Sequence, residues 1–248
     1  MDYATQIKST TLARPIYLIA GGTRPGLTKP DPTLAHIVAL AGRPRPAIAY
    51  IGVASNDDRD FLNWLTIRLR RAGAGVVRLV KLAAPDSDLG QARSLLQEAD
   101  MIFVSGGDVA FGMFHLRRKR IIPFLKRLYL AGKRFAGLSA GSIMLARCWV
   151  HWADPDDDST ASTFPCLGLA PIVCDTHGEG DDWGELKTLM RIGRPAVGYG
   201  IPSGAVLRVD ADGGVAALVK PVQRFAHRGG RIIQMDDLRP GRTAPRAR

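Results

Sequence analysis

The chain has 248 residues, 46% of them hydrophobic, which is enough to bury one substantial core. No run of about eighteen apolar residues occurs, and residues 1–14 lack the apolar segment of a signal peptide, so we expect a cytoplasmic protein without a membrane span. The three cysteines, Cys148, Cys166 and Cys174, have no C-x-x-C spacing. They indicate a reducing compartment and predict neither a disulfide framework nor a zinc site.

The net charge of +11 is unevenly distributed along the chain. Residues 151–190 contain nine acidic residues and one basic residue, a net charge of −8, so the remainder carries +19. Basic residues gather at 68–71, 117–120 and 239–248. No recognition motif and no aromatic interleaving accompanies them. We therefore interpret them as solvated surface and a basic tail, and do not expect nucleic-acid binding.

In the first half of the chain, apolar segments that often end in glycine alternate with helical patterns. Buried strands are predicted at residues 15–22, 47–55, 76–82 and 101–107, and helices at 33–41, 57–72, 88–99, 109–122 and 124–131. This alternation predicts a mostly parallel sheet with helices on both faces. Because functional groups collect where such strands end, Gly21, Gly22, Gly106, Gly107 and Asp108 are expected at one edge.

Residues 133–146 contain the motif around which the chain is organised. A short strand leads into Gly-Leu-Ser-Ala-Gly, and a helix is expected from there to about residue 149. Ser139 between two glycines at a strand-to-helix turn is typical of a nucleophile elbow. The other interpretation is a serine that caps the helix N-terminus. Because Ser139 directly follows a strand, we expect it at the same edge of the sheet as the glycine loops.

After residue 149 the pattern changes to short strands separated by glycine and aspartate turns. A strand over 167–176 is expected to deliver His177, followed by a helix over 183–192 and strands at 196–202, 205–209, 215–219 and 231–235. These predict a small antiparallel C-terminal extension. Without a linker or repeat, we expect one domain over residues 1–238 and a basic, flexible tail over 239–248.

A serine nucleophile needs a base and an oxyanion hole. His177 is the favoured base among five histidines, because it follows a strand and lies among acids. A surface histidine in an acidic loop is the alternative, and an esterase of the α/β-hydrolase type would use His227 instead. The backbone N–H groups of Ala140 and Gly107 are the expected oxyanion donors.

These residues resemble the dipeptidase E and cyanophycinase family of serine peptidases. The resemblance runs from about residue 15 to 209, and it depends on the strand, G-G-D and helix at 104–111, the elbow at 137–141, the segment 167–177 and the V-G-Y-G-I-P sequence at 197–202. It implies a fold similar to class I glutamine amidotransferases, a flavodoxin-like three-layer sandwich. It also implies Ser139 as nucleophile, His177 as base, Gly107 and Ala140 as oxyanion donors, and Asp154 as the aspartate that follows the nucleophile helix. No metal or organic cofactor is expected.

Two positions depart from the family pattern. Ser203 stands where the resemblance places the third triad member, a glutamate, so Asp154, Asp175 or Glu179 would have to orient His177. The residues after His177 are acidic, which predicts a small peptide or amide substrate that is cationic rather than aspartyl. The alternative is a catalytically silent binding or scaffold protein on the same fold. A homodimer is also compatible with the sequence.

Overall fold

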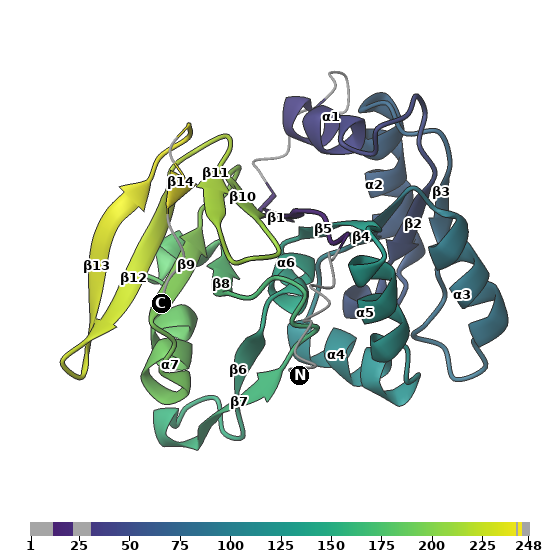
Figure 1. Cartoon of the computed structure of the whole chain (residues 1–248). Helices are drawn as coiled ribbons and strands as arrows, with labels where there is room; N and C mark the ends of the chain where they lie inside the picture. The colour runs from purple at the N-terminus through teal and green to yellow at the C-terminus, as the bar shows by residue number, and fades with distance from the viewer. Residues whose placement is uncertain (1–11, 22–30, 242, 245–248) are drawn as a thin grey trace, which may run out of the picture.

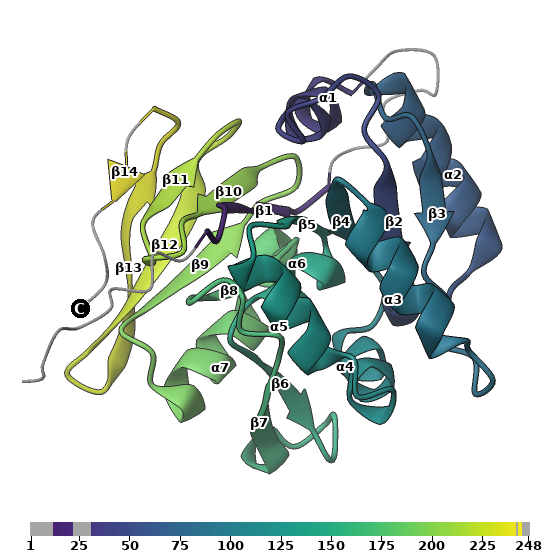
Figure 2. The same cartoon turned by 45° about the vertical axis from the view of Figure 1, so that its right-hand side comes forward.

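The computed structural model describes residues 12–21, 31–241 and 243–244, and within them the central element is an eight-stranded sheet (Figures 1 and 2). Its strand order is β14-β11-β10-β1-β5-β4-β2-β3. The parallel strands are β1 (Ile16–Ile19), β2 (Ile48–Ile51), β3 (Val77–Leu79), β4 (Met101–Val104) and β5 (Arg134–Leu138). The antiparallel strands are β10 (Val206–Val209), β11 (Val215–Ala217) and β14 (Thr243–Ala244).

Helices cover both faces of this sheet. One face carries α1 (Pro32–Ala39) and α2 (Arg59–Arg71), and the other carries α3 (Leu89–Glu98), α4 (Val109–Arg118), α5 (Ile122–Leu130) and α6 (Ala140–Leu145). Successive strand residues point to opposite faces: Tyr50 packs with α1 and α2, whereas Ile51 joins the core on the other side. The predicted α/β architecture, flavodoxin-like with a mostly parallel sheet, is therefore confirmed.

Aspartates define where four of these helices begin. Each occupies the N-cap, and its side chain accepts hydrogen bonds from backbone N–H groups of the first turn. Such caps are each worth about 1 kcal/mol. The four caps are Asp31, Asp58, Asp88 and Asp108. Asp108 fixes the start of α4 directly after the Gly106-Gly107 turn, so the cap also positions that loop.

The C-terminal part is larger than the expected extension, because it builds a second sheet of order β13-β12-β9-β8 among the described residues. Its strands are β8 (Val173–Thr176), β9 (Val197–Ile201), β12 (Val222–Arg228) and β13 (Arg231–Leu238), and α7 (Gly184–Gly193) packs against them (Figure 1). Strand β12 was not predicted. It forms because Gly229 and Gly230, both with positive φ, close a hairpin with β13.

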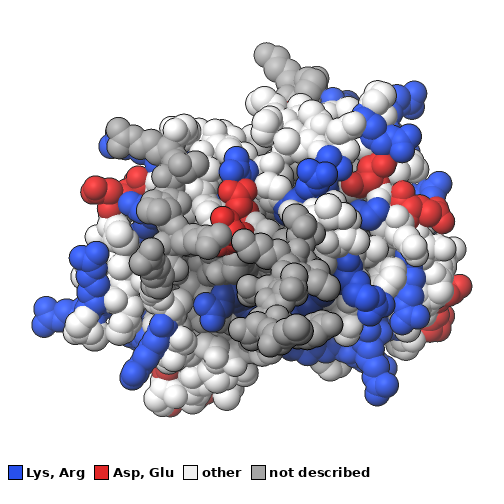
Figure 3. Space-filling model, viewed as in Figure 1, with Lys and Arg blue, Asp and Glu red and all other residues white. Residues whose placement is uncertain are grey.

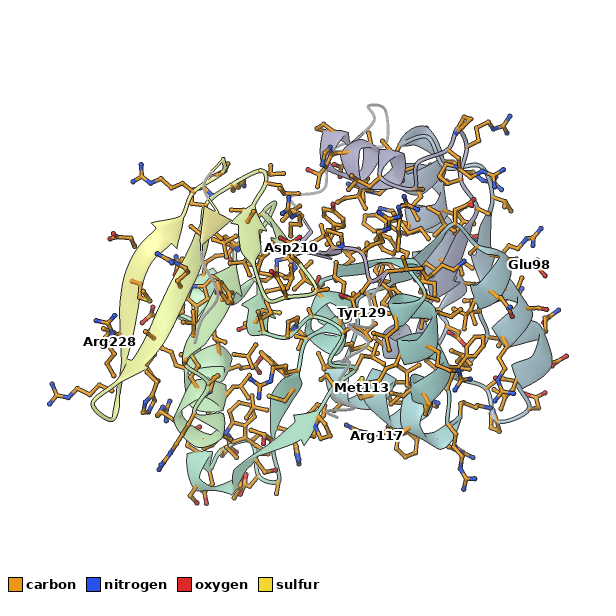
Figure 4. All side chains as sticks on the ribbon, in the orientation of Figure 1. Glu98, Met113, Arg117, Tyr129, Asp210 and Arg228 are labelled. Atoms are coloured by element: carbon orange, nitrogen blue, oxygen red, sulfur yellow. The ribbon has the colours of Figure 1, made fainter. Side chains whose placement is uncertain are left out.

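The segment after the elbow also differs from expectation. Helix α6 ends at Leu145, not near residue 149, and a hairpin of β6 (Cys148–Trp152) and β7 (Ala161–Pro165) follows. The aromatic and β-branched residues of β6 favour a strand, and the acidic residues 154–158 form the connection. Arg117, labelled in Figure 4, reaches this hairpin from α4. Its guanidinium lies over the Phe164 ring and bonds to the Pro165 carbonyl.

The stretch expected to be a flexible tail contributes β14, which pairs with β11 at the edge of the main sheet. An edge strand offers unpaired N–H and C=O groups, which explains why the chain adds there. Residues 242 and 245–248, and Gly22 of the first glycine turn, lie outside the described residues. Lys and Arg side chains are spread over the face shown in Figure 3 and gather at its lower right. No described helix has the length and apolar character needed to cross a membrane.

Candidate active site

Ser139 lies at a sharp turn between β5 and α6, with φ 52° and ψ −123°. A non-glycine residue with positive φ is strained, and such strain concentrates at functional sites. A Cβ on Gly137 would lie 2.6 Å from the Gly141 carbonyl oxygen, and a Cβ on Gly141 would lie 2.1 Å from that of Val104. The elbow therefore requires both glycines. The Ser139 side chain caps no backbone group, which contradicts the helix-cap interpretation.

Hydrogen bonds to β1 hold the elbow in place. The Ser139 N–H donates to the Ile19 carbonyl at 2.8 Å. The buried Ser142 hydroxyl accepts from the Ile19 N–H at 2.9 Å and donates to the Ile19 carbonyl at 3.0 Å. Ser139 Oγ itself has no hydrogen-bond partner among the described residues. The nucleophile candidate is thus fixed through its backbone and free at its hydroxyl.

The glycine loop after β4 lies directly against the elbow. A Cβ on Gly106 would lie 3.2 Å from Ser139 Cβ. Gly107 has φ 137°, and a Cβ there would lie 2.1 Å from the Ala54 carbonyl oxygen. Within the described part of the chain, neither the Gly107 N–H nor the Ala140 N–H donates a hydrogen bond. These are the two amides that the sequence predicts as oxyanion donors, and both are available to a ligand.

His177 follows β8 and adopts the left-handed conformation, φ 66°. It lines, together with Ser139, a cavity of about 350 Å³. The ring passes over Gly21, where a Cβ would lie 3.6 Å from Cε1 and 3.8 Å from Nε2. No hydrogen bond joins Ser139 to His177 between these described side chains. The fold therefore brings the predicted nucleophile and base to one cavity but leaves the bond between them unmade.

Ser203 contacts the other side of the His177 ring, where its Oγ lies 3.0 Å from Nδ1. Its N–H donates to Glu179 Oε1 at 2.8 Å, and its carbonyl accepts from Lys220 Nζ at 2.9 Å. All three polar groups of Ser203 are therefore engaged. When Nδ1 carries the proton and donates to Ser203, Nε2 keeps the lone pair that a base requires.

The electrostatics around His177 come from burial and from one carboxylate. Partial burial of the ring lowers the pKa of His177, and the nearby Glu179 opposes this shift. Burial alone would raise the pKa of Glu179, but hydrogen bonds from the Ser203 amide and hydroxyl, together with the charge of His177, bring it below its usual value. Glu179 is therefore ionised behind Ser203, and His177 is neutral at pH 7.

The other two predicted acids are not placed as orienting groups. Asp175 is buried in β8, where its carboxylate accepts from the Thr176 N–H at 2.6 Å, and burial raises its pKa to about 7. Asp154 lies in the connection between β6 and β7 and accepts from the Asp156 N–H. Neither bonds to His177, and neither lines the cavity beside Ser139. His227 on β12 is also absent from that lining.

Sequence reasoning missed two residues at this site. The sequence treats Ser203 only as the residue that replaces a glutamate. The position itself, however, predicts that the side chain of residue 203 contacts the His177 ring. Lys220, which reaches Ser203 from the loop before β12, belongs to no motif. Only the fold brings it there, and no sequence signal indicates it.

Comparisons with known proteins give independent information on the family and the fold. The profile of peptidase family S51 matches residues 16–215. No curated protein sequence matches the chain. Among solved structures, a peptidase from an acI-B1 Actinobacterium is similar with a TM-score of 0.70 at 15% identity, over 94% of this chain and 96% of that one. A putative peptidase E protein from Listeria monocytogenes EGD-e is similar with a TM-score of 0.54 at 16% identity, over 90% and 98%. At these identities the structures show a shared fold, and the family profile, which covers most of the sequence, shows that the chain belongs to peptidase family S51, the dipeptidase E family.

Proposed function

We propose that the protein is a serine hydrolase that cleaves a small peptide or amide by acyl transfer. The observation that carries the proposal is the shared cavity of Ser139 and His177, with a strained elbow on one side and a fixed ring on the other. Ser139 Oγ attacks the substrate carbonyl and gives its proton to His177 Nε2. The carbonyl oxygen becomes an oxyanion held by the N–H groups of Gly107 and Ala140.

The remaining steps, departure of the amine and hydrolysis of the acyl-enzyme, use the same groups. His177 returns the proton to the leaving nitrogen, which departs as the amine and leaves an ester on Ser139. A water molecule then attacks this ester while His177 takes its proton. When the second oxyanion collapses, the bond to Ser139 Oγ breaks, His177 gives the proton to Oγ, and the acid product is released.

Ser203 and Glu179 replace the directly bonded carboxylate in this proposal. The Ser203 hydroxyl accepts from His177 Nδ1–H and donates toward Glu179, whose negative charge stabilises the imidazolium that forms. Ser203 and Glu179 are positioning residues, because they act through His177 and touch no substrate atom.

The test of the nucleophile is covalent labelling by a fluorophosphonate probe, which reacts with activated serines. We expect the wild-type chain to be labelled at Ser139, the Ser139→Ala variant to be unlabelled, and His177→Ala to be labelled at least about a hundredfold more slowly. His227→Ala is the matched control and should react at the wild-type rate. Loss of labelling in His227→Ala but not in His177→Ala would refute the assignment of the base.

A catalytically silent protein is the second candidate, and two observations favour it. Among the residues that the structure describes, no carboxylate bonds to His177 Nδ1, and the hydrogen bond between Ser139 and His177 is not formed. The same labelling experiment separates the two candidates, since a silent site would leave the folded wild-type chain unlabelled.

A further inference from the structure

The cavity beside Ser139 has an apolar, partly aromatic wall. This wall comes from α1 and α2, which lie over the face of the sheet next to β1. Phe61 and Trp64 stack there with ring centroids 5.6 Å apart. Pro32, Leu34 and Leu65 complete this side of the cavity. A volume of about 350 Å³ lies at the lower end of the range for small-molecule sites, and these walls fit a flat apolar group.

The described part of the cavity lining carries one acidic and two basic side chains, so its net charge is positive. The acid, Asp31, already has partners at both oxygens. Its Oδ1 accepts from two backbone N–H groups of α1, and its Oδ2 pairs with Arg68 at 2.7 Å. Arg68 also lies over the Trp64 ring, 4.8 Å from its centroid. Both oxygens of Asp31 are thus engaged and its charge is balanced by Arg68, which disfavours Asp31 as the partner of a cationic substrate.

Lys220 is the second cation of the lining and has no carboxylate partner among the described residues. It donates to the Ser203 carbonyl at 2.9 Å, which uses one of its three N–H bonds. Gly204 makes room for this approach, because a Cβ there would lie 2.9 Å from Lys220 Nζ. The ammonium group is thus held at the cavity that Ser139 and His177 also line, with two donors still available.

We propose, on the basis of the proposed function, that the substrate carries an apolar, preferably aromatic, side chain and a carboxylate, and that Lys220 binds the carboxylate. This reverses the preference expected from the acidic residues after His177. Glu179, Asp181 and Asp182 do not belong to the cavity lining that the structure describes, and Asp182 is paired with Lys187 at 2.6 Å. Among the described lining residues, Lys220 is therefore the charged group that no carboxylate balances.

The test measures binding to the Ser139→Ala variant, so it does not require turnover. N-acetyl-phenylalanine and its neutral amide are titrated by calorimetry and by tryptophan fluorescence, with N-acetyl-lysine amide as the cationic probe. We expect the carboxylate to bind about tenfold more tightly than the amide, as for a hydrogen bond to a charged group. Adding Lys220→Met should abolish this difference and leave the affinity for the amide unchanged.

The control is Lys126→Met, an exposed lysine on α5 outside the cavity, which should keep the tenfold preference. Trp64→Phe should keep binding of both phenylalanine probes, whereas Trp64→Ala should weaken both equally. The proposal is overturned if the amide or the lysine probe binds as tightly as the carboxylate, if Lys220→Met retains the preference, or if neither phenylalanine probe binds at millimolar concentration. A wild-type chain that fluorophosphonates do not label would instead overturn the proposed function, and the binding result would stand by itself.

Discussion

Ser203→Ala tests whether the Ser203 hydroxyl positions His177 in place of a glutamate. It removes the hydroxyl 3.0 Å from His177 Nδ1 and leaves the backbone bonds of residue 203 to Glu179 and Lys220 in place. While His177 is neutral, this hydrogen bond is worth about 0.5–1.5 kcal/mol. When the ring becomes an imidazolium in the transition state, the bond is charge-assisted and worth about 1.5–3 kcal/mol.

The difference between these values is the part that affects the rate, because only interactions stronger in the transition state accelerate a reaction. A difference of about 1–2 kcal/mol corresponds to a rate about 5- to 30-fold lower. Loss of the fixed tautomer adds to this, so we expect a decrease of about 10- to 100-fold for Ser203→Ala.

The second-order rate of fluorophosphonate labelling measures this decrease without knowledge of the substrate. Ser203→Thr keeps the hydroxyl and should recover most of the rate, and Ser87→Ala removes a surface hydroxyl elsewhere and should change nothing. If folded Ser203→Ala reacts at the wild-type rate, Ser203 does not position His177, and the proposed link between His177 and Glu179 is wrong.

Three further substitutions have separate readouts. Gly107→Ala would place a Cβ 2.1 Å from the Ala54 carbonyl oxygen, so the loop must move. We expect fluorophosphonate labelling to slow by about 10²–10³-fold because the Gly107 N–H is displaced. A labelling rate within twofold of wild type would contradict the assignment of Gly107 as an oxyanion donor. Glu179→Gln removes the charge that raises the pKa of His177, so the acidic limb of the labelling rate should move to lower pH, whereas a purely structural effect would lower the rate without moving the limb. Asp175 has a pKa of about 7 when folded against about 3.9 unfolded, so its ionisation destabilises the fold above pH 7 by up to about 4 kcal/mol and costs nothing below pH 4. Asp175→Asn should therefore raise the free energy of unfolding, measured with urea, at pH 8 but not at pH 4.

The parallel half of the fold and the elbow could be predicted because local sequence determines them. Buried apolar strands, amphipathic helices and aspartate caps each carry their own signal within a few residues. Gly137 and Gly141 were identified from the motif, and the structure gives the reason, since a Cβ at either position would collide with backbone. Gly107, after the end of β4, is required for the same reason, because a Cβ there would collide with the backbone of Ala54.

The second sheet and the surroundings of His177 depend on contacts between distant segments, which periodicity does not report. Strand β12 reads as a polar loop until Gly229 and Gly230 pair it with β13. Ser203 and Lys220 lie 26 and 43 positions after His177, and only the pairing of β8 with β9 brings this region to the ring. The resemblance to the family indicated which residue would meet His177, but not that a serine there would bond to both the ring and Glu179.

Under the proposed function, Ser203 in the place of a glutamate leaves a negative charge near His177 but makes its contact with the ring indirect. Glu179 already accepts the Ser203 N–H, so a second carboxylate at residue 203 would lie next to the first and raise the pKa of one of them. A single carboxylate that acts on His177 through the Ser203 hydroxyl avoids this repulsion between neighbouring carboxylates. Partial burial keeps His177 neutral at pH 7, so the ring can accept the Ser139 proton without a directly bonded carboxylate. What the indirect contact weakens is stabilisation of the imidazolium, because the Glu179 carboxylate does not bond directly to the ring. Under the proposed function, we therefore expect the same acyl-transfer chemistry at a lower rate and with a pH dependence still set by His177.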